Sequence, residues 1–420
     1  MTRGRPLVAL LGATAMGILA VVAVACRVDA PGEDVNVKGT PNRGGATSGG
    51  TPTNVAPGFD KRALLASIAE CTVGRYRAFE AVARELDVAA RAWAGSPADD
   101  GLRTRTQAAY ARAMDAWQRA EMFRFGPASA SPRPGAKDLR DQIYAWPLFN
   151  RCKIDETTVD GSYGAGAFPT SLISARGLGA IEYLAFHGGT DNACSSFSPI
   201  TANGTWAALG PAGLRGRKAA YTAAAAADVL SRATALVRAW EPASGDFQKE
   251  LVTAGSGSRV FATNQDAFNT INDALFYVEV EVKDLKLARP LGLVECGHGS
   301  CASTVESPWA RRSKENIAAN LEGFRDVFQG CGEGHAGVSF DDWLRAAGAG
   351  DLADRMLAAT TGAEQAIVAV GPSLEDALAA RPAEVAAAHA AVKRLTDLLK
   401  TEFISVLNLE LPKTTEGDND

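Results

Sequence analysis

The sequence predicts an all-α protein made of packed helical bundles. Apolar residues recur at steps of three and four over long stretches, as they do on one face of an α-helix. No alternating apolar pattern bounded by hairpin turns is present, so strands are not indicated. With 420 residues and 46 % hydrophobic content, the chain can form two medium-sized cores, and two bundle subdomains are the expectation.

The amino terminus reads as an export signal. Arg3 and Arg5 precede an apolar run from Leu7 to Ala25 that ends in small residues before Cys26. The spacing resembles a bacterial lipobox, which would make Cys26 the lipidated first residue of the mature chain. We therefore expect residues 1–26 to be a lipoprotein signal peptide. The alternatives are an ordinary signal peptide and an uncleaved helix, since about 19 apolar residues could span a bilayer.

Residues 27–57 are rich in Gly, Pro, Thr and Asn and have no sustained apolar period, so they predict a flexible linker. A folded region over residues 58–410 follows, with an N-terminal bundle at about 58–210 and a C-terminal bundle at about 211–410. Residues 411–420 form a tail. We expect a lipid-anchored protein of the cell envelope, at the outer membrane or facing the periplasm.

Helical periodicity places the main elements along the folded region. We expect helices near residues 60–93, 102–124, 170–187, 217–240, 313–329 and 340–358. The helix at 340–358 begins with Ser339 and Asp342 at the spacing of a capping box.

Two further stripes are the clearest. One joins Phe268 to Leu285 on a helix that starts at Thr263 and closes before Pro290 and Gly292. Pro382 starts the other helix, whose stripe ends at Val406.

Charge argues against one class of partner. The net charge is −5 and the isoelectric point is near 5.6. Lys and Arg do not form runs that interleave with aromatic residues. We therefore expect no binding of nucleic acid.

Six cysteines remain when the anchor residue is set aside. An even number in an exported chain favours disulfides, for which 15 connectivities exist. Two pairs are suggested by position: a small loop closed by the fourth and fifth, and a brace of an irregular stretch by the second and third. In chain order, the candidates are Cys71, Cys152, Cys194, Cys296, Cys301 and Cys331.

Two acids are predicted to face the protein interior. Glu182 lies among apolar residues in SLISARGLGAIEYLAFH, and Glu121 shares a helical face with Tyr110 and Trp117. A buried carboxylate must be paired, protonated or bound to a ligand. Inward acids from separate helices suit a metal or cation site, to which Asp141 could contribute. Pairing with Arg124 or Arg176 would explain the same residues.

Several blocks together resemble the imelysin-like family of bacterial exported proteins: AEMFRFGP, YAWPL, RGLGAIEYLAFH, KLARPLG, ESPWARRSKENIAANLEGF and the closing EGDND. They occur in the family's order over about residues 59–420. The resemblance implies two helical bundles with a functional cleft between them, export or lipid anchoring, and an association with iron acquisition. It also implies a relation to metallopeptidases, as founding members were described.

The family motif GxHxxE aligns its Gly and Glu with Gly177 and Glu182, which puts Gly179 where the His should be. Arg176 and Trp146 occupy further positions in the resembling blocks. Zinc catalysis generally needs about three protein ligands, so the missing imidazole weakens a catalytic site.

We therefore interpret the protein as a non-catalytic binding lipoprotein. It would be linked to the acquisition of iron or another divalent metal and would act with metal-uptake or redox partner proteins. Glu182, Glu121 and Asp141 are the candidate ligand residues. The alternatives are a zinc-dependent peptidase and a structural partner of an outer-membrane or redox assembly.

The anchor can be tested by changing Cys26→Ser. Without the thiol no thioether can form, so we expect loss of lipid labelling and of stable membrane association. Metabolic labelling with a fatty acid, compared with the wild type, measures this. Equal labelling of the two proteins would contradict the lipoprotein assignment.

Overall fold

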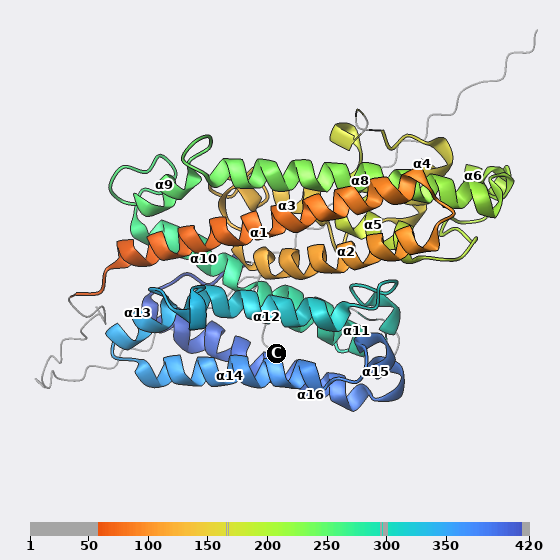
Figure 1. Cartoon of the computed structure of the whole chain (residues 1–420). Helices are drawn as coiled ribbons and strands as arrows, with labels where there is room; N and C mark the ends of the chain where they lie inside the picture. The colour runs from red at the N-terminus through yellow and green to blue at the C-terminus, as the bar shows by residue number, and fades with distance from the viewer. Residues whose placement is uncertain (1–57, 165, 167, 295, 297–300, 414–420) are drawn as a thin grey trace, which may run out of the picture. The chain divides into compact units, whose positions relative to one another are not determined.

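The described chain consists of α-helices that lie side by side in layers (Figure 1). The computed structural model describes residues 58–413, apart from 165, 167, 295 and 297–300. The predicted signal peptide with Cys26, the linker and residues 414–420 of the tail lie outside this part. The longer helices are α1 (Lys61–Gly95), α2 (Asp100–Ala120), α8 (Gly210–Trp240), α10 (Asn264–Leu275), α12 (Ser313–Gln329), α14 (Gly350–Ala369) and α16 (Pro382–Leu398).

Shorter elements connect the long helices. Those that matter below are η1 (Glu121–Phe123), α3 (Leu139–Ile143), α4 (Arg151–Asp160), α5 (Gly177–Phe186), the π-helical segment η5 (Val278–Ala288), α11 (Arg289–Leu291) and α13 (Phe340–Ala346). The described residues contain no β-strand, so the all-α prediction is confirmed.

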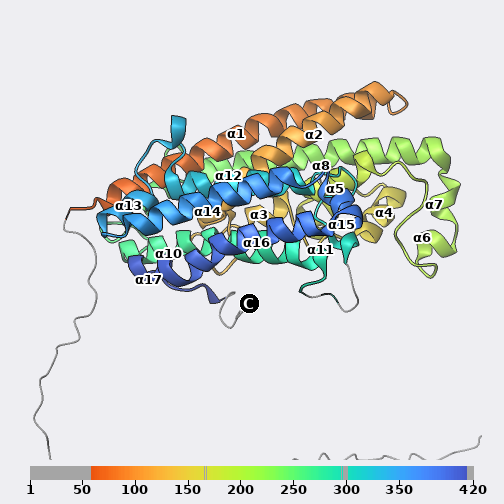
Figure 2. The ribbon, with the colours of Figure 1, turned by 90° about the horizontal axis from the view of Figure 1, so that it is seen from below.

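The helices pack in two groups joined by α12. In the first group, α1 packs against α2 and α8, and α5 packs against α8 and α2. In the second group, α14 and η5 pack against α16. The α12 helix contacts both α2 and α14, and Figures 1 and 2 show it between the groups. One continuous set of buried apolar side chains runs from α1 to α16.

The predicted boundary near residue 210 precedes α8, a helix that packs against α1 and α5. Contacts between Cα atoms place the described residues in one compact unit. The division into an N-terminal and a C-terminal bundle at that boundary stays a prediction.

Three helix starts follow from capping residues. The Asp60 carboxylate accepts hydrogen bonds from the first backbone N–H groups of α1, at Arg62 and Ala63, both at 3.0 Å. Thr263 forms a capping box with Asp266 at the start of α10. The capping box expected at Ser339 is likewise present at the start of α13. These side chains satisfy N–H groups that have no partner inside the helix.

The helix predicted at 170–187 begins later than expected. Two short 3₁₀ turns occupy residues 168–175, Arg176 is extended, and α5 starts only at Gly177 with φ of 70°. An added Cβ at Gly177 would lie 2.3 Å from the carbonyl oxygen of Ile143. This glycine is therefore needed for a left-handed corner that touches the backbone of α3.

Two other helix ends also differ from the prediction. The stretch 340–358 is two helices, α13 and α14, because the chain turns through Gly348 at φ of 80°. The helix expected to close before Pro290 continues through it in α11 and ends at Gly292, which also has φ of 80°. Pro290 thus lies in the last turn of a continuous helical run and itself has no N–H to donate.

The π-helical turns of η5 place charged residues in the interior. Glu279, Lys283 and Lys286 are fully buried, whereas Leu285 on the predicted apolar stripe is only half-buried. A π-helix has a wider turn than an α-helix, so a stripe drawn at steps of three and four drifts off the buried face. Lys400 forms an ion pair of 2.6 Å with Glu279, which compensates part of this charge.

All six candidate cysteines form disulfides. Cys152–Cys194 and Cys296–Cys301 are the two pairs suggested by the sequence, and both are confirmed. The third, Cys71–Cys331, joins α1 to the segment after α12 with Cα atoms 5.9 Å apart.

Membrane anchoring is not addressed by the folded region. Among the helices that the structure describes, none combines the length and apolar character needed to cross a bilayer.

The role of the Gly177 corner can be tested with Gly177→Ala. A Cβ at positive φ costs about 1–2 kcal/mol, and the contact with the Ile143 carbonyl adds to this. We therefore expect the melting temperature to fall by about 3 °C or more. Gly74→Ala is the matched control, because Gly74 is an exposed position of α1 with nothing within 4 Å of an added Cβ. A smaller loss at position 177 than at position 74 would refute this explanation.

Candidate functional site

The N-terminal end of α5 is held by a buried arginine. The Arg176 guanidinium donates to the carbonyl oxygen of Phe168 and, at 3.1 Å, to the side-chain oxygen of Gln142. It also pairs with Asp228 of α8 at 3.5 Å. These contacts hold the extended residue Arg176 in place before Gly177. The direction in which α5 starts is therefore fixed. The predicted motif position Arg176 therefore positions the helix that carries Glu182.

Glu182 is buried, with 2 % of its surface exposed. Its Oε1 accepts hydrogen bonds from the backbone N–H groups of Trp309 and Ala310, at 3.1 and 3.0 Å. Its Oε2 accepts one from the Tyr110 hydroxyl at 3.3 Å. Burial raises the pKa of the Glu182 carboxyl to about 7, although the hydrogen bonds to the backbone act in the opposite direction. Near neutral pH this acid can therefore be protonated or ionised.

A second acid, Glu306, lies close by and was missed by the sequence analysis. Its Oε1 accepts from Gln118 at 2.9 Å and from the Tyr144 hydroxyl at 2.9 Å, and it pairs with Lys286 at 3.0 Å. Its Oε2 is buried and has no hydrogen-bond partner. The residue stands in the block ESPWARR, which indicated the family but did not mark this acid as buried.

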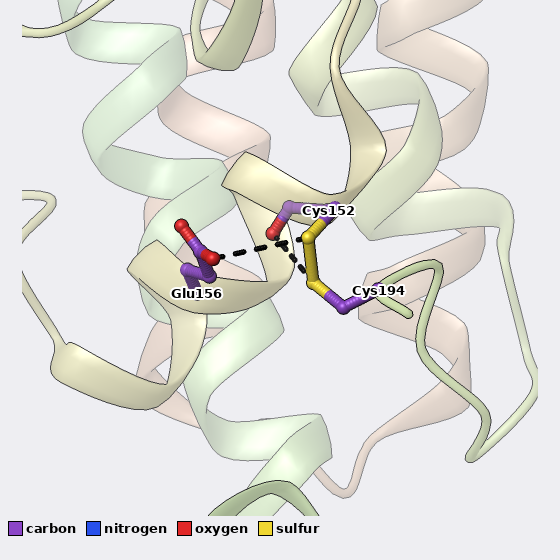
Figure 3. A group of neighbouring side chains, drawn as sticks. All are labelled: Cys152, Glu156 and Cys194. Atoms are coloured by element: carbon purple, nitrogen blue, oxygen red, sulfur yellow. Dashed lines mark hydrogen bonds between the residues drawn. A yellow bond between two sulfur atoms is a disulfide. The ribbon is translucent and has the colours of Figure 1, made fainter. Parts of the chain in front are cut away.

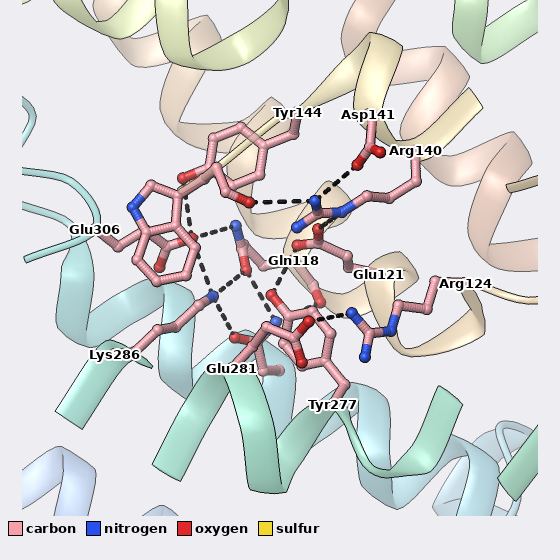
Figure 4. A network of polar contacts seen from close by, with 12 residues as sticks. Gln118, Glu121, Arg124, Arg140, Asp141, Tyr144, Tyr277, Glu281, Lys286 and Glu306 are labelled. Carbon is pink, nitrogen blue, oxygen red and sulfur yellow. Dashed lines mark hydrogen bonds and ion pairs between the residues drawn. The ribbon is translucent and has the colours of Figure 1, made fainter. Parts of the chain in front are cut away.

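The predicted acids Glu121 and Asp141 belong to an ion-pair cluster (Figure 4). Arg140 donates to Glu121 at 2.6 Å and to Asp141 at 2.9 Å. It also donates to the carbonyl oxygen of Trp146 at 3.1 Å, and the Tyr277 hydroxyl donates to Glu121 at 3.0 Å. Both acids thus have strong donors, which is the paired state that the sequence left open, although Arg140 is the partner instead of Arg124 or Arg176.

Lys286 connects this cluster to Glu306. Its ammonium donates to the side-chain oxygens of Gln118 and Asn320, both at 2.7 Å, and lies 5.3 Å from the ring centre of Tyr277. Asn320 in turn donates to Gln118 at 2.9 Å. The network joins α2, η5 and α12, which are far apart in the sequence (Figure 4). The network holds the side chains of Lys286, Gln118 and Asn320 next to Glu306 in one arrangement.

Glu121, Asp141 and Glu182 do not converge. Glu121 and Asp141 share the partner Arg140, whereas Glu182 bonds to other groups. In the described part of the chain the three acids do not form a set whose ligand atoms lie within 4.8 Å of one another. Their role as metal or ligand residues stays a prediction, but they cannot chelate one ion in this arrangement.

One set of three side chains does meet that distance within the described residues: Cys152, Glu156 and Cys194 (Figure 3). The two cysteines share a disulfide, so neither sulfur is a thiolate. Metal binding by cysteine requires the thiolate. This set is therefore a covalent brace between α4 and the loop that follows α5.

Two adjoining hollows surround the acids. A cavity of about 20 Å³ is lined by Glu182, Glu306 and Gly179, together with the aromatic side chains of Trp146 and Trp309. This volume is about that of one water-sized probe. An outer hollow of about 420 Å³ shares Trp146, Trp309 and Glu306 with it. The predicted motif residues Gly179 and Trp146 thus line the same site as Glu182.

The donor set does not suit a divalent transition metal. Both oxygens of Glu182 accept hydrogen bonds, and the paired oxygen of Glu306 already faces the Lys286 ammonium. Gly179 offers no imidazole. Such a metal prefers nitrogen or sulfur ligands in sufficient number, and this site presents N–H and O–H donors instead.

Two tyrosines keep their protons in this site. Burial, with nearby carboxylates, raises the pKa of Tyr110 and of Tyr144 well above the usual value. Both hydroxyls therefore remain donors to Glu182 and Glu306. These donors can stabilise the carboxyl groups of Glu182 and Glu306 in either the ionised or the protonated form.

The raised pKa of Glu182 predicts a pH-dependent stability. The native state binds the proton more tightly than the unfolded state, so its contribution is full below about pH 4.5 and is lost as the pH rises through about 7. Glu182→Gln imitates the protonated acid and removes this loss. The stability of Glu182→Gln relative to the wild type should rise by up to about 3 kcal/mol between pH 5 and 8. Denaturant unfolding of both proteins over this range measures the difference, and parallel pH profiles would disprove it.

Comparison with known proteins identifies the fold and the family. Residues 73–401 match the family model Peptidase_M75, Imelysin. An imelysin-like protein from Psychrobacter arcticum 273-4 has 15 % sequence identity and a TM-score of 0.63, over 85 % of this chain and 99 % of that chain. An iron-regulated protein A precursor from Parabacteroides distasonis ATCC 8503 has 15 % identity and a TM-score of 0.62, over 84 % and 95 %. The comparison with curated proteins gave no significant match. Because the family model covers well over half of the sequence, this chain belongs to the imelysin family.

Proposed function

We propose that this imelysin-family protein is an exported, lipid-anchored binding protein without peptidase activity. It binds its ligand in the hollows between Glu182 and Glu306 and acts, through a partner protein, in the acquisition of iron or another metal. The name of one structural neighbour, an iron-regulated protein A precursor, supports the link to iron at the level of the family.

The observation that carries the proposal is the position of Gly179. It lies three residues before Glu182, on nearly the same face of α5, and both residues line the inner cavity. An imidazole here would point at the acid, and the glycine leaves that space to the ring of Phe149, 3.1 Å from where a Cβ would stand. The site thus keeps the acid of the motif without its nitrogen ligand.

A zinc-dependent peptidase is the competing function. Such an enzyme needs a metal with an open position and a general base beside it. Glu182 already accepts three hydrogen bonds from Tyr110, Trp309 and Ala310, and one oxygen of the neighbouring acid Glu306 is paired with Lys286. This arrangement supports the binding of a molecule more than the activation of water.

Export is part of the same proposal. Three disulfides, joining all six cysteines of the folded region, favour an oxidising compartment. Lipidation at Cys26 would keep the protein at the envelope surface, where the linker of residues 27–57 gives the folded region reach toward a partner.

The missing imidazole can be tested by Gly179→His. We expect the wild type to show no chelator-sensitive proteolysis of an unfolded substrate, and Gly179→His to bind Zn²⁺ or Ni²⁺ about tenfold more tightly than the wild type. The gain should vanish on acidification as the ring protonates, and it should not occur with Ca²⁺ or Mg²⁺. Calorimetry on the apo protein measures the affinity.

Gly179→Ala is the matched control, because it adds the same Cβ beside Phe149 without a ligand atom. It should bind metal as the wild type does. Tight transition-metal binding together with chelator-sensitive peptidase activity in the wild type would overturn the proposed function.

A further inference from the structure

We propose that the hollows at Glu306 bind a small zwitterion, whose ammonium group meets Glu306 and whose carboxylate meets Arg151 in the outer hollow. This inference rests on the proposed binding role of the site and adds the chemical class of its ligand.

The inner end of the site offers an unused acceptor. Glu306 is 4 % exposed, and its Oε2 has no hydrogen-bond partner, while its Oε1 takes all three donors from Gln118, Tyr144 and Lys286. A buried carboxylate oxygen without a donor is costly. The described protein donors to Glu306 are all used on the other oxygen, and Glu306 lines both hollows, so Oε2 is the acceptor that remains for a ligand donor at this residue. An ammonium group supplies three N–H donors and a positive charge.

The walls suit the same group. Trp146, Phe149 and Trp309 line both hollows, and the rings of Phe149 and Trp309 lie 5.7 Å apart, tilted by 59°. Aromatic faces attract cations and also pack against an apolar body. One contact of this kind is already present in the site, because the Lys286 ammonium lies 5.7 Å from the ring centre of Trp146.

The outer end has the opposite charge. Arg151 and Arg289 line the outer hollow, where Glu306 is the one acid among the described lining residues. The Arg151 guanidinium lies over the Trp309 ring at 5.6 Å, and its charge also acts on the Asp155 carboxyl. A guanidinium fixed on an aromatic face is well placed to bind a carboxylate.

The negative charge at the inner end and the positive charges at the outer end favour a zwitterion over a ligand with a single charge. A bare amine would have to enter past two arginines, and a bare carboxylate would meet Glu306 at the floor. A molecule with an ammonium group, a small apolar body and a carboxylate satisfies both ends. The outer hollow, at about 420 Å³, has room for a molecule of the size of an amino acid.

The test uses two zwitterions of different charge spacing, L-phenylalanine and 6-aminohexanoate. Each is titrated calorimetrically into the purified protein beside its single-charge analogues: phenethylamine and 3-phenylpropionate for the first, hexylamine and hexanoate for the second. We expect at least one zwitterion to bind about tenfold more tightly than both of its analogues. No binding of either zwitterion up to about 10 mM, or equal binding of an analogue, would overturn the proposal.

Variants locate the binding. Arg151→Gln should weaken zwitterion binding about fivefold and leave the amines unaffected, whereas Arg105→Gln, at an exposed position of α2 away from both hollows, should change neither. Glu306→Gln should weaken zwitterions and amines alike. If Glu306→Gln is misfolded by circular dichroism, the Arg151→Gln comparison decides, and an unchanged affinity there would refute the outer contact.

The two proposals fail separately. The ligand class would be overturned, and the binding role would stand, if neither zwitterion binds while Gly179→His gains metal affinity and the wild type shows no proteolysis. Metal-dependent proteolysis by the wild type would overturn the proposed function, whatever the titrations show.

Discussion

The structure depends on the pairing of charges that its helices bury. Lys286 and Glu306 form an ion pair with both side chains fully buried, and Arg140 pairs with the equally buried Glu121. An uncompensated charge in such a position would cost several kcal/mol, so each pair requires its partner helix or loop to be in place. The hydrogen bonds of Gln118 to this network tie α2 to η5, α12 and the loop before α12. These contacts hold the two groups of helices in register at the candidate site.

The same constraint gives the two acids of the site different states. Glu306 faces an ammonium group and two neutral donors, whereas Glu182 accepts from backbone N–H groups and a tyrosine hydroxyl. Burial raises the pKa of Glu182 to about 7, and the charge of the nearby Glu306 acts in the same direction. One small cavity thus contains a carboxylate that is ion-paired through one oxygen and a carboxylate that exchanges its proton near neutral pH, both beside aromatic side chains.

The glycines of α5 have separate purposes. Gly177 permits the left-handed corner against the Ile143 carbonyl, which aims α5 at the cavity. Gly179 has ordinary helical geometry and faces the Phe149 ring. Its lack of a side chain is what shapes the cavity. The sequence motif does not distinguish these two glycines. Gly177 determines the path of the backbone into α5, whereas Gly179 determines which ligand atoms are present in the cavity.

Much of the fold follows from the sequence alone. Apolar spacing located α1, α8 and α12, and the capping residues at Thr263 and Ser339 marked true helix starts. The even cysteine number, in a chain predicted to be exported, indicated disulfides that are present. The burial of Glu182 also followed from its apolar neighbours. Such features depend on residues within a few turns of one another, and local periodicity records them.

Tertiary structure decided the site itself. Glu306 meets Gln118 from 188 positions away, Trp309 meets Glu182 from 127 positions away, and Arg140 pairs with both Glu121 and Asp141. No local pattern encodes which of several charged residues will pair across so long a separation. The π-helical turn that buries Lys286 also breaks the spacing on which the sequence prediction relied. The sequence therefore determined the helices and one acid, while the packing of distant segments determined the partners that give that acid its chemistry.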